Sequence, residues 1–340
     1  AGLRARKMRS GEKMSPFDGK IGDLPQAMNP LGRVLSASRL EELAECPYKF
    51  FLHHILGLEP PEEIEFDPTQ WLDPMERGSL LHEIYCDFMT ELSRKGEQAH
   101  VGRHRSRLRQ IAESKLKQAR RETPPPSQAV YAKERKEIMD SLDIFLDLES
   151  KNDKSRPLLF EAPFGMSGKR GDTAPVKIPA GRKTILLRGI IDRIDQVGDN
   201  MFRVIDYKTG SFKKYEDLET FNEGKILQYA LYALAAREII RARGLSEAPE
   251  IRDSGYFFPT LKGEGREVYF PPPSPQLLSQ VLGILTRMIE EGFFPVNPEA
   301  ACRYCDYAML CGDSAKETAK EKKKTDPEAL NVFEELKEHK

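Results

Sequence analysis

In the first half of the chain, apolar residues recur every three or four positions, the spacing of one face of a helix. This pattern predicts a helix over residues 73–94 and further helices near 102–122 and 129–149, with a Thr-Pro-Pro-Pro run between the last two. A serine start signal and an internal proline predict a short helix, a break and a second helix within residues 36–56. We expect residues 95–150 to form a helical insertion in a larger core.

In the second half, short runs rich in Ile, Leu, Val and Phe and punctuated by Gly and Asp predict strands. These runs are PLLFEAPF, TILLRGIIDRIDQV and MFRVIDYKTG. The pattern continues with a helix over about 223–242, strands near 252–259 and 266–270, and a helix over about 276–291. It predicts an α/β fold whose sheet has an antiparallel component.

Composition allows one core with elaborations, because the 340 residues are 39% hydrophobic and 31% charged. No apolar run is long enough to span a bilayer, so we expect a cytoplasmic protein without a membrane partner. The chain begins with Ala, and its first residues lack periodicity. We therefore expect a fragment of a longer protein, with a flexible segment over 1–35 and a charged tail over 314–340.

The net charge of −1 gives no overall signature of nucleic-acid binding, so any DNA-binding surface must be local. One candidate is the stretch 103–121, where eight Lys and Arg residues accompany a single acid, Glu113. A solvated helix face has the same composition and is the more common explanation of such a stretch.

Two aspartates are expected to face each other across a hairpin. Gly198, Asp199 and Asn200 suit a tight turn, and a turn centred on Asp199 places Asp192 opposite Asp206. Both carboxylates would then lie on a largely apolar face, where an unpaired buried polar group costs about 2–7 kcal/mol. A hard divalent cation such as Mg²⁺ or Mn²⁺ would compensate that cost.

Lys208 lies two residues after Asp206, so its ammonium group points to the same face and can hold a water or stabilise charge on phosphorus. Asp192, Asp206 and Lys208 together fit a phosphodiesterase site. The alternative is a structural ion pair in which Lys208 or Arg193 neutralises one acid.

Three further residues are candidates for this site only if the two aspartates and Lys208 form it. Gln228 and Tyr232 share one helix face at a spacing of four residues, which an ordinary amphipathic helix also shows. His82 lies inside a predicted helix, where most histidines are not ligands. Cys86, one turn later, is interpreted as a small buried hydrophobic residue.

The other four cysteines are Cys46 and a C-x₂-C-x₅-C group formed by Cys302, Cys305 and Cys311. Four thiolates can hold a zinc ion or an iron–sulfur cluster, and the spacing leaves both open. Either metal centre would join the two ends of the chain, which offsets the entropy of closing so long a loop.

Several segments resemble the nuclease domain of the AddB subunit of AddAB helicase–nucleases, a branch of the RecB-type PD-(D/E)XK nucleases. RGSLLHEIY resembles the GxxxH motif, LRGIIDRID and VIDYKTG resemble the core acid motifs, and QYALY resembles the QxxxY motif. SASRLEELAECPYKFFLHHILGLEP and ACRYCDYAMLCG resemble the two cluster-binding segments. The similarity covers about Ser36 to Gly312, and residues 95–150 match no motif of this family.

The resemblance implies a PD-(D/E)XK domain over 36–313, with a mixed sheet flanked by helices and a cluster that joins the two ends. It implies that His82, Asp192, Asp206 and Tyr207 bind Mg²⁺ or Mn²⁺, and that Lys208, Gln228 and Tyr232 assist catalysis. It also implies a 4Fe-4S cluster on Cys46, Cys302, Cys305 and Cys311.

The function that these expectations support is metal-dependent hydrolysis of DNA, with single strands as the expected substrate, in double-strand-break repair. A non-catalytic DNA-binding module and a CRISPR-associated type of exonuclease are the alternatives. The sequence contains no GxxxxGK[ST] motif, so a helicase or ATPase motor would have to lie in a partner or in another region.

Overall fold

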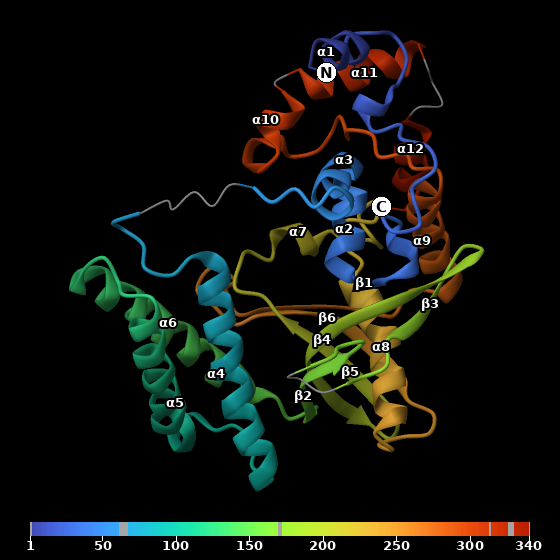
Figure 1. The fold of residues 1–340 in the computed structure, drawn as a ribbon. Coiled ribbons are helices and arrows are strands. Elements are labelled where there is room, and N and C mark those ends of the chain that lie inside the picture. The colour runs from blue at the N-terminus through green and yellow to red at the C-terminus, as the bar shows by residue number, and fades with distance from the viewer. Residues whose placement is uncertain (1, 61–66, 169–171, 313, 326–329, 340) are drawn as a thin grey trace.

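The computed structural model describes residues 2–60, 67–168, 172–312, 314–325 and 330–339. Their core is a seven-stranded mixed sheet in the order β1-β4-β5-β6-β7, with β2 and β3 also paired to β4 (Figure 1). The strands are β1 (Val34–Ser36), β2 (Arg156–Phe164), β3 (Val176–Ala180), β4 (Lys183–Gly198), β5 (Met201–Tyr207), β6 (Glu250–Phe258) and β7 (Arg266–Phe270). The predicted α/β class with an antiparallel component is confirmed.

The long strand β4 organises the sheet. Its first half pairs with β1 in parallel and with β3 in antiparallel orientation, and its second half lies between β2 and β5, both antiparallel to it. Strand β5 then pairs in parallel with β6, because helix α8 (Gln228–Ala242) provides the crossover between them. The short strand β1 and strand β3 did not stand out in the sequence pattern.

The hairpin register agrees with the prediction. Arg193 lies opposite Ile205 and Ile194 opposite Val204, and the same register sets Asp192 opposite Asp206. An irregularity near the turn, beside Asn200 with its φ of 56°, does not shift this register farther along the strands.

Two hydrophobic clusters cover opposite faces of the sheet. Val204 and Phe202 belong to the larger cluster, which includes the buried faces of α8 and α9 (Pro275–Glu290). Ile205 and Tyr207, the alternate residues of β5, belong to the second cluster, which is built mainly from three long helices. These helices are α4 (Pro74–Lys95), α5 (Val101–Glu122) and α6 (Gln128–Lys151).

The helical insertion, α5 and α6, stands beside the sheet together with α4 (Figure 1), and Phe145 of α6 contacts Tyr207 of β5 and Phe257 of β6. All three helices agree with the sequence pattern. Helix α4 begins with a capping box, since the Asp73 side chain accepts hydrogen bonds from Met75 N and Glu76 N, both at 2.7 Å. The cap defines the first residue of α4, and His82 then falls on the side of the helix that faces the strands.

The N-terminal part of the core contains α2 (Ala37–Glu45), α3 (Pro47–Phe50) and η3 (Phe51–Ile55). Pro47 separates the first two, as the sequence predicts, and η3 is a π-helix. Helix α7 (Lys213–Glu216) follows β5, and η4 (Cys302–Tyr304) and α10 (Ala308–Cys311) carry the C-terminal cysteines.

The two ends of the described chain lie side by side (Figure 1). The first segment forms α1 (Gly2–Arg9), η1 (Pro16–Asp18) and η2 (Pro30–Gly32), and the last forms α11 (Ala315–Thr325) and α12 (Asn331–Lys337). Buried Lys322 of α11 donates to Asp18 at 2.6 Å and so connects the two segments. The domain boundaries themselves stay predictions.

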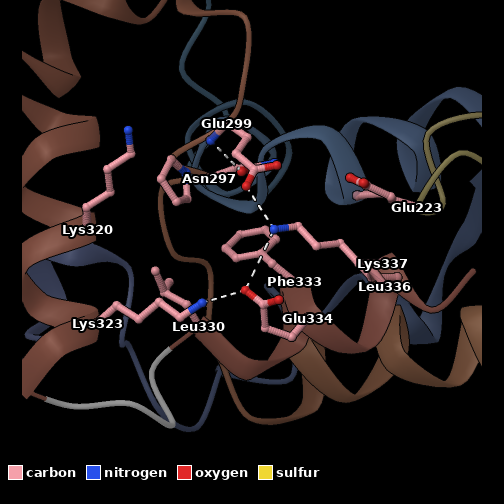
Figure 2. A pocket seen from close by; sticks show the side chains of 12 residues that line it. Glu223, Asn297, Glu299, Lys320, Lys323, Leu330, Phe333, Glu334, Leu336 and Lys337 are labelled. Atoms are coloured by element: carbon pink, nitrogen blue, oxygen red, sulfur yellow. Dashed lines mark hydrogen bonds and ion pairs between the residues drawn. The ribbon is translucent and has the colours of Figure 1, made fainter. Parts of the chain in front are cut away.

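Helix α12 packs against α9 and closes a small pocket next to the end of α11 (Figure 2). Lys337 bridges Glu299 at 2.8 Å, and Lys323 contacts Glu334 at 2.5 Å across this pocket. The charges that line it are thus largely paired with one another. Within the described ranges, no helix is both long enough and apolar enough to cross a bilayer.

Candidate active site

Three elements bring the predicted acids and histidine together at the end of the β4–β5 hairpin. His82 from α4 approaches Asp192 of β4, with its Nδ1 atom 3.4 Å from Asp192 Oδ2. The same carboxylate oxygen accepts a hydrogen bond from the backbone N–H of Tyr207 at 2.8 Å. Asp192 is thereby oriented from two sides.

A third acid, Glu161 of β2, joins this pair, and the sequence reasoning did not identify it. The register of β2 on β4 sets it opposite Asp192, between the pairs of Phe160 with Arg193 and Ala162 with Ile191. One ligand atom each from His82, Glu161 and Asp192 lies within 4.8 Å of the others, a spacing at which one metal ion can bind all three.

Asp206 lies opposite Asp192 but is engaged differently. Its Oδ1 atom accepts a hydrogen bond from Gln228 Nε2 at 2.7 Å, and its Oδ2 atom lies 2.6 Å from Lys208 Nζ. Among the described residues, Lys208 is thus the cationic neighbour of the buried Oδ2 atom, which has no further hydrogen-bond donor. A carboxylate oxygen has more than one lone pair, so this atom could also bind a metal ion.

Electrostatics reflect this crowding of acids. Burial, opposed by Lys208 and reinforced by Asp192, raises the pKa of Asp206 to about 6. Burial alone would lower the pKa of His82, but the hydrogen bond to Asp192 and the negative charges of Asp192 and Asp206 raise it overall. The site therefore has an excess of negative charge, which favours a cation.

Lys208, Gln228 and Tyr232 form a connected group on the face of the sheet covered by α8. Lys208 Nζ donates to Gln228 Oε1 at 2.9 Å, so Gln228 bridges the ammonium group and Asp206. Burial lowers the pKa of Lys208, but Asp206, Tyr215 and Asp192 together raise it by more, so the net change is upward and the group carries a charge. Burial raises the pKa of Tyr232 to about 12, and its neutral hydroxyl lies close to Gln228. The predicted pair on α8 is thus brought to the acids.

Tyr207 and Arg193 lie on the opposite face. Arg193 NH1 donates to the Tyr207 hydroxyl at 3.2 Å and to Glu149 at 2.5 Å, and the guanidinium group is fully buried. The predicted metal contact of Tyr207 could therefore come only from its backbone carbonyl. Arg193 does not neutralise Asp192 or Asp206, which removes one form of the structural ion-pair alternative, whereas the other form, Lys208 paired with Asp206 at 2.6 Å, is present.

Four of the eight basic residues in the stretch on α5 form ion pairs with acids, namely Arg105, Arg107, Arg109 and Lys115. Arg107 contacts Glu91 at 2.7 Å, Arg109 contacts Asp143 at 2.7 Å, and Lys115 contacts acids on α4. Because these pairs connect α5 to α4 and α6, they support the explanation of a solvated, ion-paired helix face.

The cysteine segments from the two ends of the chain meet next to α3. Tyr48 N donates to Pro295 O at 3.2 Å, and Asn297 Nδ2 donates to Glu45 O at 2.8 Å, immediately before Cys46. Burial raises the pKa of Cys46, and Cys305 and Cys302 raise it further, so these thiols are close enough to interact. Neither group of described ligand atoms within 4.8 Å of one another includes a cysteine.

A mixed sheet whose central hairpin presents two acids and a lysine, with further ligands from flanking elements, is the core of a PD-(D/E)XK nuclease. The chain matches the PD-(D/E)XK nuclease superfamily over residues 34–312, and it belongs to that superfamily.

The chain is also similar to larger bacterial proteins, each named as a subunit of an ATP-dependent helicase/deoxyribonuclease. The one from Moorella thermoacetica is 30% identical over 297 residues, which cover 83% of this chain and 22% of that protein. The one from Symbiobacterium thermophilum is 25% identical over 351 residues, covering 82% of this chain and 29% of that protein. The one from Clostridium perfringens is 27% identical over 206 residues, covering 58% of this chain and 17% of that protein. The chain thus spans less than a third of the length of each of these relatives.

Proposed function

We propose that this chain is the nuclease part of a helicase–nuclease and that it hydrolyses DNA phosphodiester bonds, with single-stranded DNA as its substrate, in double-strand-break repair. The observation that carries the proposal is the meeting of His82, Glu161, Asp192, Asp206 and Lys208 at one end of the hairpin. Membership in the nuclease superfamily and the names of the similar proteins support the choice of DNA. A cytoplasmic location follows from that substrate.

The donor set fits a divalent cation such as Mg²⁺ or Mn²⁺. His82, Asp192 and Asp206 would hold it, with Glu161 as a further ligand, and a bound ion would supply positive charge to the phosphate and make water more acidic. The convergence of ligand atoms from His82, Glu161 and Asp192 within 4.8 Å of one another supports this fit.

Gln228, Lys208 and the Tyr207 backbone would orient the groups that react. Gln228 fixes Asp206 and Lys208 relative to each other through hydrogen bonds of 2.7 and 2.9 Å. Lys208 places an ammonium group where it can orient a water or stabilise the negative charge that develops on the phosphate oxygens. The Tyr207 backbone N–H keeps Asp192 turned toward His82.

The test is cleavage of labelled single-stranded and double-stranded DNA with Mg²⁺, with Mn²⁺ and with EDTA. Asp206→Asn and Lys208→Ala should each lower the cleavage rate at least about 100-fold, because each removes charge from the reacting centre. The matched controls are Asp199→Asn at the hairpin turn and Lys262→Ala, both at exposed positions. Wild-type protein that retains DNA but yields no metal-dependent product would instead support a non-catalytic DNA-binding module.

We propose further that Cys46, Cys302, Cys305 and Cys311 hold a 4Fe-4S cluster that ties the two ends of the domain together. The mutual influence of these thiols on their pKa values supports their proximity. Thiolates that bind different irons of one cluster stand farther apart than the ligands of one ion, which is compatible with a wider spacing. Zinc on the same thiolates is the alternative. The partner that supplies ATP-driven movement would be a helicase subunit or region outside this chain.

A further inference from the structure

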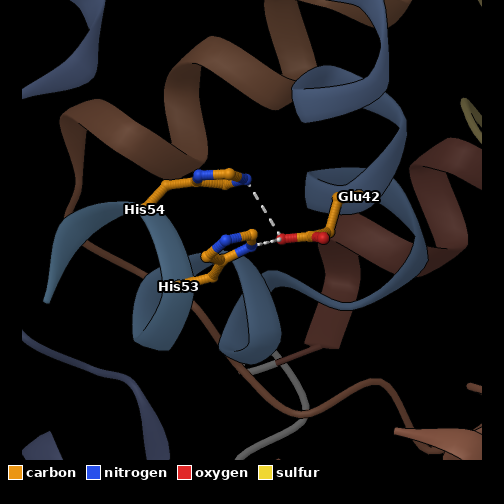
Figure 3. A group of neighbouring side chains, drawn as sticks. All are labelled: Glu42, His53 and His54. Carbon is orange, nitrogen blue, oxygen red and sulfur yellow. Dashed lines mark hydrogen bonds and ion pairs between the residues drawn. The ribbon is translucent and has the colours of Figure 1, made fainter. Parts of the chain in front are cut away.

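A second cluster of metal-ligating side chains, shown in Figure 3, is separate from the group formed by His82, Glu161 and Asp192. Glu42 of α2 faces His53 and His54 of the π-helix η3, and one ligand atom from each lies within 4.8 Å of the others. Glu42 Oε1 is 3.3 Å from His53 Nδ1 and 3.2 Å from His54 Nε2. Neither the nuclease proposal nor the cysteine proposal uses these residues.

Two consecutive histidines of η3 lie close to one carboxylate. Neighbouring side chains of an α-helix diverge by about 100°. In η3 the helix is widened, and Leu56 N bonds to Phe51 O at 2.9 Å, five residues back. The two imidazole rings stack with centroids 4.0 Å apart, and one nitrogen of each lies near Glu42 Oε1. Single-turn π segments are frequent at functional sites.

Two of the separations among these atoms match those of a tetrahedral zinc centre. Zinc binds imidazole nitrogen and carboxylate oxygen at about 2.0–2.2 Å, and ligands at tetrahedral angles are then about 3.3 Å apart. The two nitrogen-to-oxygen separations, 3.2 and 3.3 Å, equal that edge, and one of the stacked rings would turn to direct its nitrogen at the shared ion. We propose that Glu42, His53 and His54 form a binding site for a zinc-type divalent ion, with water as the fourth ligand.

The surroundings permit such an ion to enter and to be held. The His53 side chain is 35% exposed, whereas those of His54 and Glu42 are 13% and 19% exposed, so the site opens on one side. Lys49 Nζ lies 3.5 Å from the other oxygen, Glu42 Oε2, and is the nearest opposing charge on this carboxylate. Two nitrogens and one carboxylate oxygen suit Zn²⁺ or Co²⁺ better than Mg²⁺.

The ion would have a definite structural effect. It would join α2 to η3, with Cys46 and the short helix α3 between them, and the ring of Tyr307 from the C-terminal segment lies 6.1 Å from that of His53. The site would therefore stiffen the N-terminal support of the cysteine region independently of the nuclease reaction.

The test is a titration of the full chain with Co²⁺, whose absorption spectrum depends on the atoms that bind it. Thiolate ligands give an intense near-ultraviolet band, whereas imidazole and carboxylate ligands give only weak visible bands. Wild-type protein should bind about one more Co²⁺ per chain than Glu42→Gln or His54→Gln, and the missing absorption should lack the thiolate band. Exposed His100→Gln is the matched control and should bind as wild type.

Circular dichroism and EDTA-treated melting temperatures of the variants should match wild type, which separates ligand loss from unfolding. Zn²⁺ should raise the melting temperature of wild type more than that of Glu42→Gln. Equal binding of Co²⁺ by wild type and both variants would overturn the proposal and leave a histidine–carboxylate hydrogen-bond network.

The variant Lys49→Gln tests the site in the opposite direction. Removal of the lysine charge should tighten Co²⁺ binding several-fold, and weaker binding would contradict the assigned geometry.

Discussion

At the scale of single residues, Arg193 shows that the β4–β5 hairpin carries the nuclease acids on one face and a buried ion-pair network on the other. Its side chain is fully buried on the face opposite the nuclease acids, where it contacts Asp195 at 2.6 Å and Glu149 at 2.5 Å. Burial would lower the pKa of Arg193, but these two carboxylates raise it well above the ordinary value. The charge is therefore held in the interior by its partners, and each partner depends on it.

Arg193→Met should destabilise the protein by about 3–5 kcal/mol, because it leaves two buried carboxylates without their counter-charge. Urea unfolding followed by circular dichroism measures this change. Arg109→Met is the matched control, since Arg109 forms an exposed ion pair with Asp143 worth about 0–1 kcal/mol. Equal losses in the two variants would contradict the importance of the buried network.

Glu161→Gln should weaken the use of Mg²⁺ about 10–100-fold, measured as the Mg²⁺ concentration that gives half-maximal DNA cleavage. The amide keeps the size of the side chain but supplies a poorer ligand for a hard cation. Glu161 has a φ of 44°, and backbone strain of this kind clusters at functional sites. Exposed Glu83→Gln, next to His82 on α4, is the control. An unchanged Mg²⁺ requirement in Glu161→Gln would exclude Glu161 as a ligand.

The contrast between these acids shows which part of the site the sequence could reveal. Asp192 and Asp206 are joined by a short turn, so local arithmetic places them opposite each other. Glu161 reaches Asp192 through the pairing of β2 with β4, and the loop between those strands does not define their register. Arg193, which the sequence offered as a neutraliser of the acids, faces away from them because the side chains of a strand alternate.

At the scale of elements, the start of α8 depends on a residue from α2. The Glu41 side chain accepts hydrogen bonds from Leu227 N at 2.7 Å and Gln228 N at 2.8 Å, and so caps the helix that carries Gln228 and Tyr232. Burial raises the pKa of Glu41, although these two hydrogen bonds and Lys208 act against the rise. The sequence predicted this helix from about residue 223, but its start is set by this distant carboxylate.

Glu41→Gln should therefore change how stability depends on pH. The pKa of Glu41 in the folded protein is raised above 4.5, so the buried ionised form lowers the stability of the fold. This cost grows as the pH rises from 4.5 through the folded pKa, and it disappears as the pH falls back toward 4.5. The neutral glutamine variant should lack this component, so wild type should lose stability relative to it as the pH rises. Each tenfold difference in proton affinity between folded and unfolded chains is worth about 1.4 kcal/mol.

Urea unfolding of both proteins at several pH values above 4.5 measures this difference. Exposed Glu238→Gln on the same helix serves as the control and should follow wild type at every pH. A constant difference between wild type and Glu41→Gln would show that the carboxyl group titrates alike in the folded and unfolded states.

Elements with strong internal periodicity were predictable, and those defined by distant partners were not. Helices α4, α5 and α6 and the hairpin follow from local spacing. Strand β1 is only three residues long and exists because it pairs with Leu186 and its neighbours on β4. Strand β3 contains Pro179 and lies on the outer side of β4, so its sequence carries little strand signal.

At the scale of the whole molecule, the two ends of the chain support each other around the cysteines. Phe294 stacks on Phe51 with ring centroids 5.5 Å apart, and the Tyr307 hydroxyl donates to Leu58 O at 2.6 Å. Arg9 also donates to Cys311 O at 2.8 Å. Closing a loop between Cys46 and Cys302 costs conformational entropy, and these contacts together with a metal centre would offset it.

If a 4Fe-4S cluster completes this junction, replacing any one of Cys46, Cys302, Cys305 or Cys311 by Ser should remove most of the iron and the visible absorbance together. Hydrogen exchange should then become faster both in residues 37–58 and in residues 293–312, because each segment loses its anchor to the other. Cys86→Ser is the matched control, since Cys86 lies on α4 and bonds locally to Thr90. If the Cys46→Ser variant retained all of its iron, Cys46 would not be a ligand of the cluster. If the wild-type protein were colourless and contained one zinc ion, the metal centre would be a zinc site and not an iron–sulfur cluster.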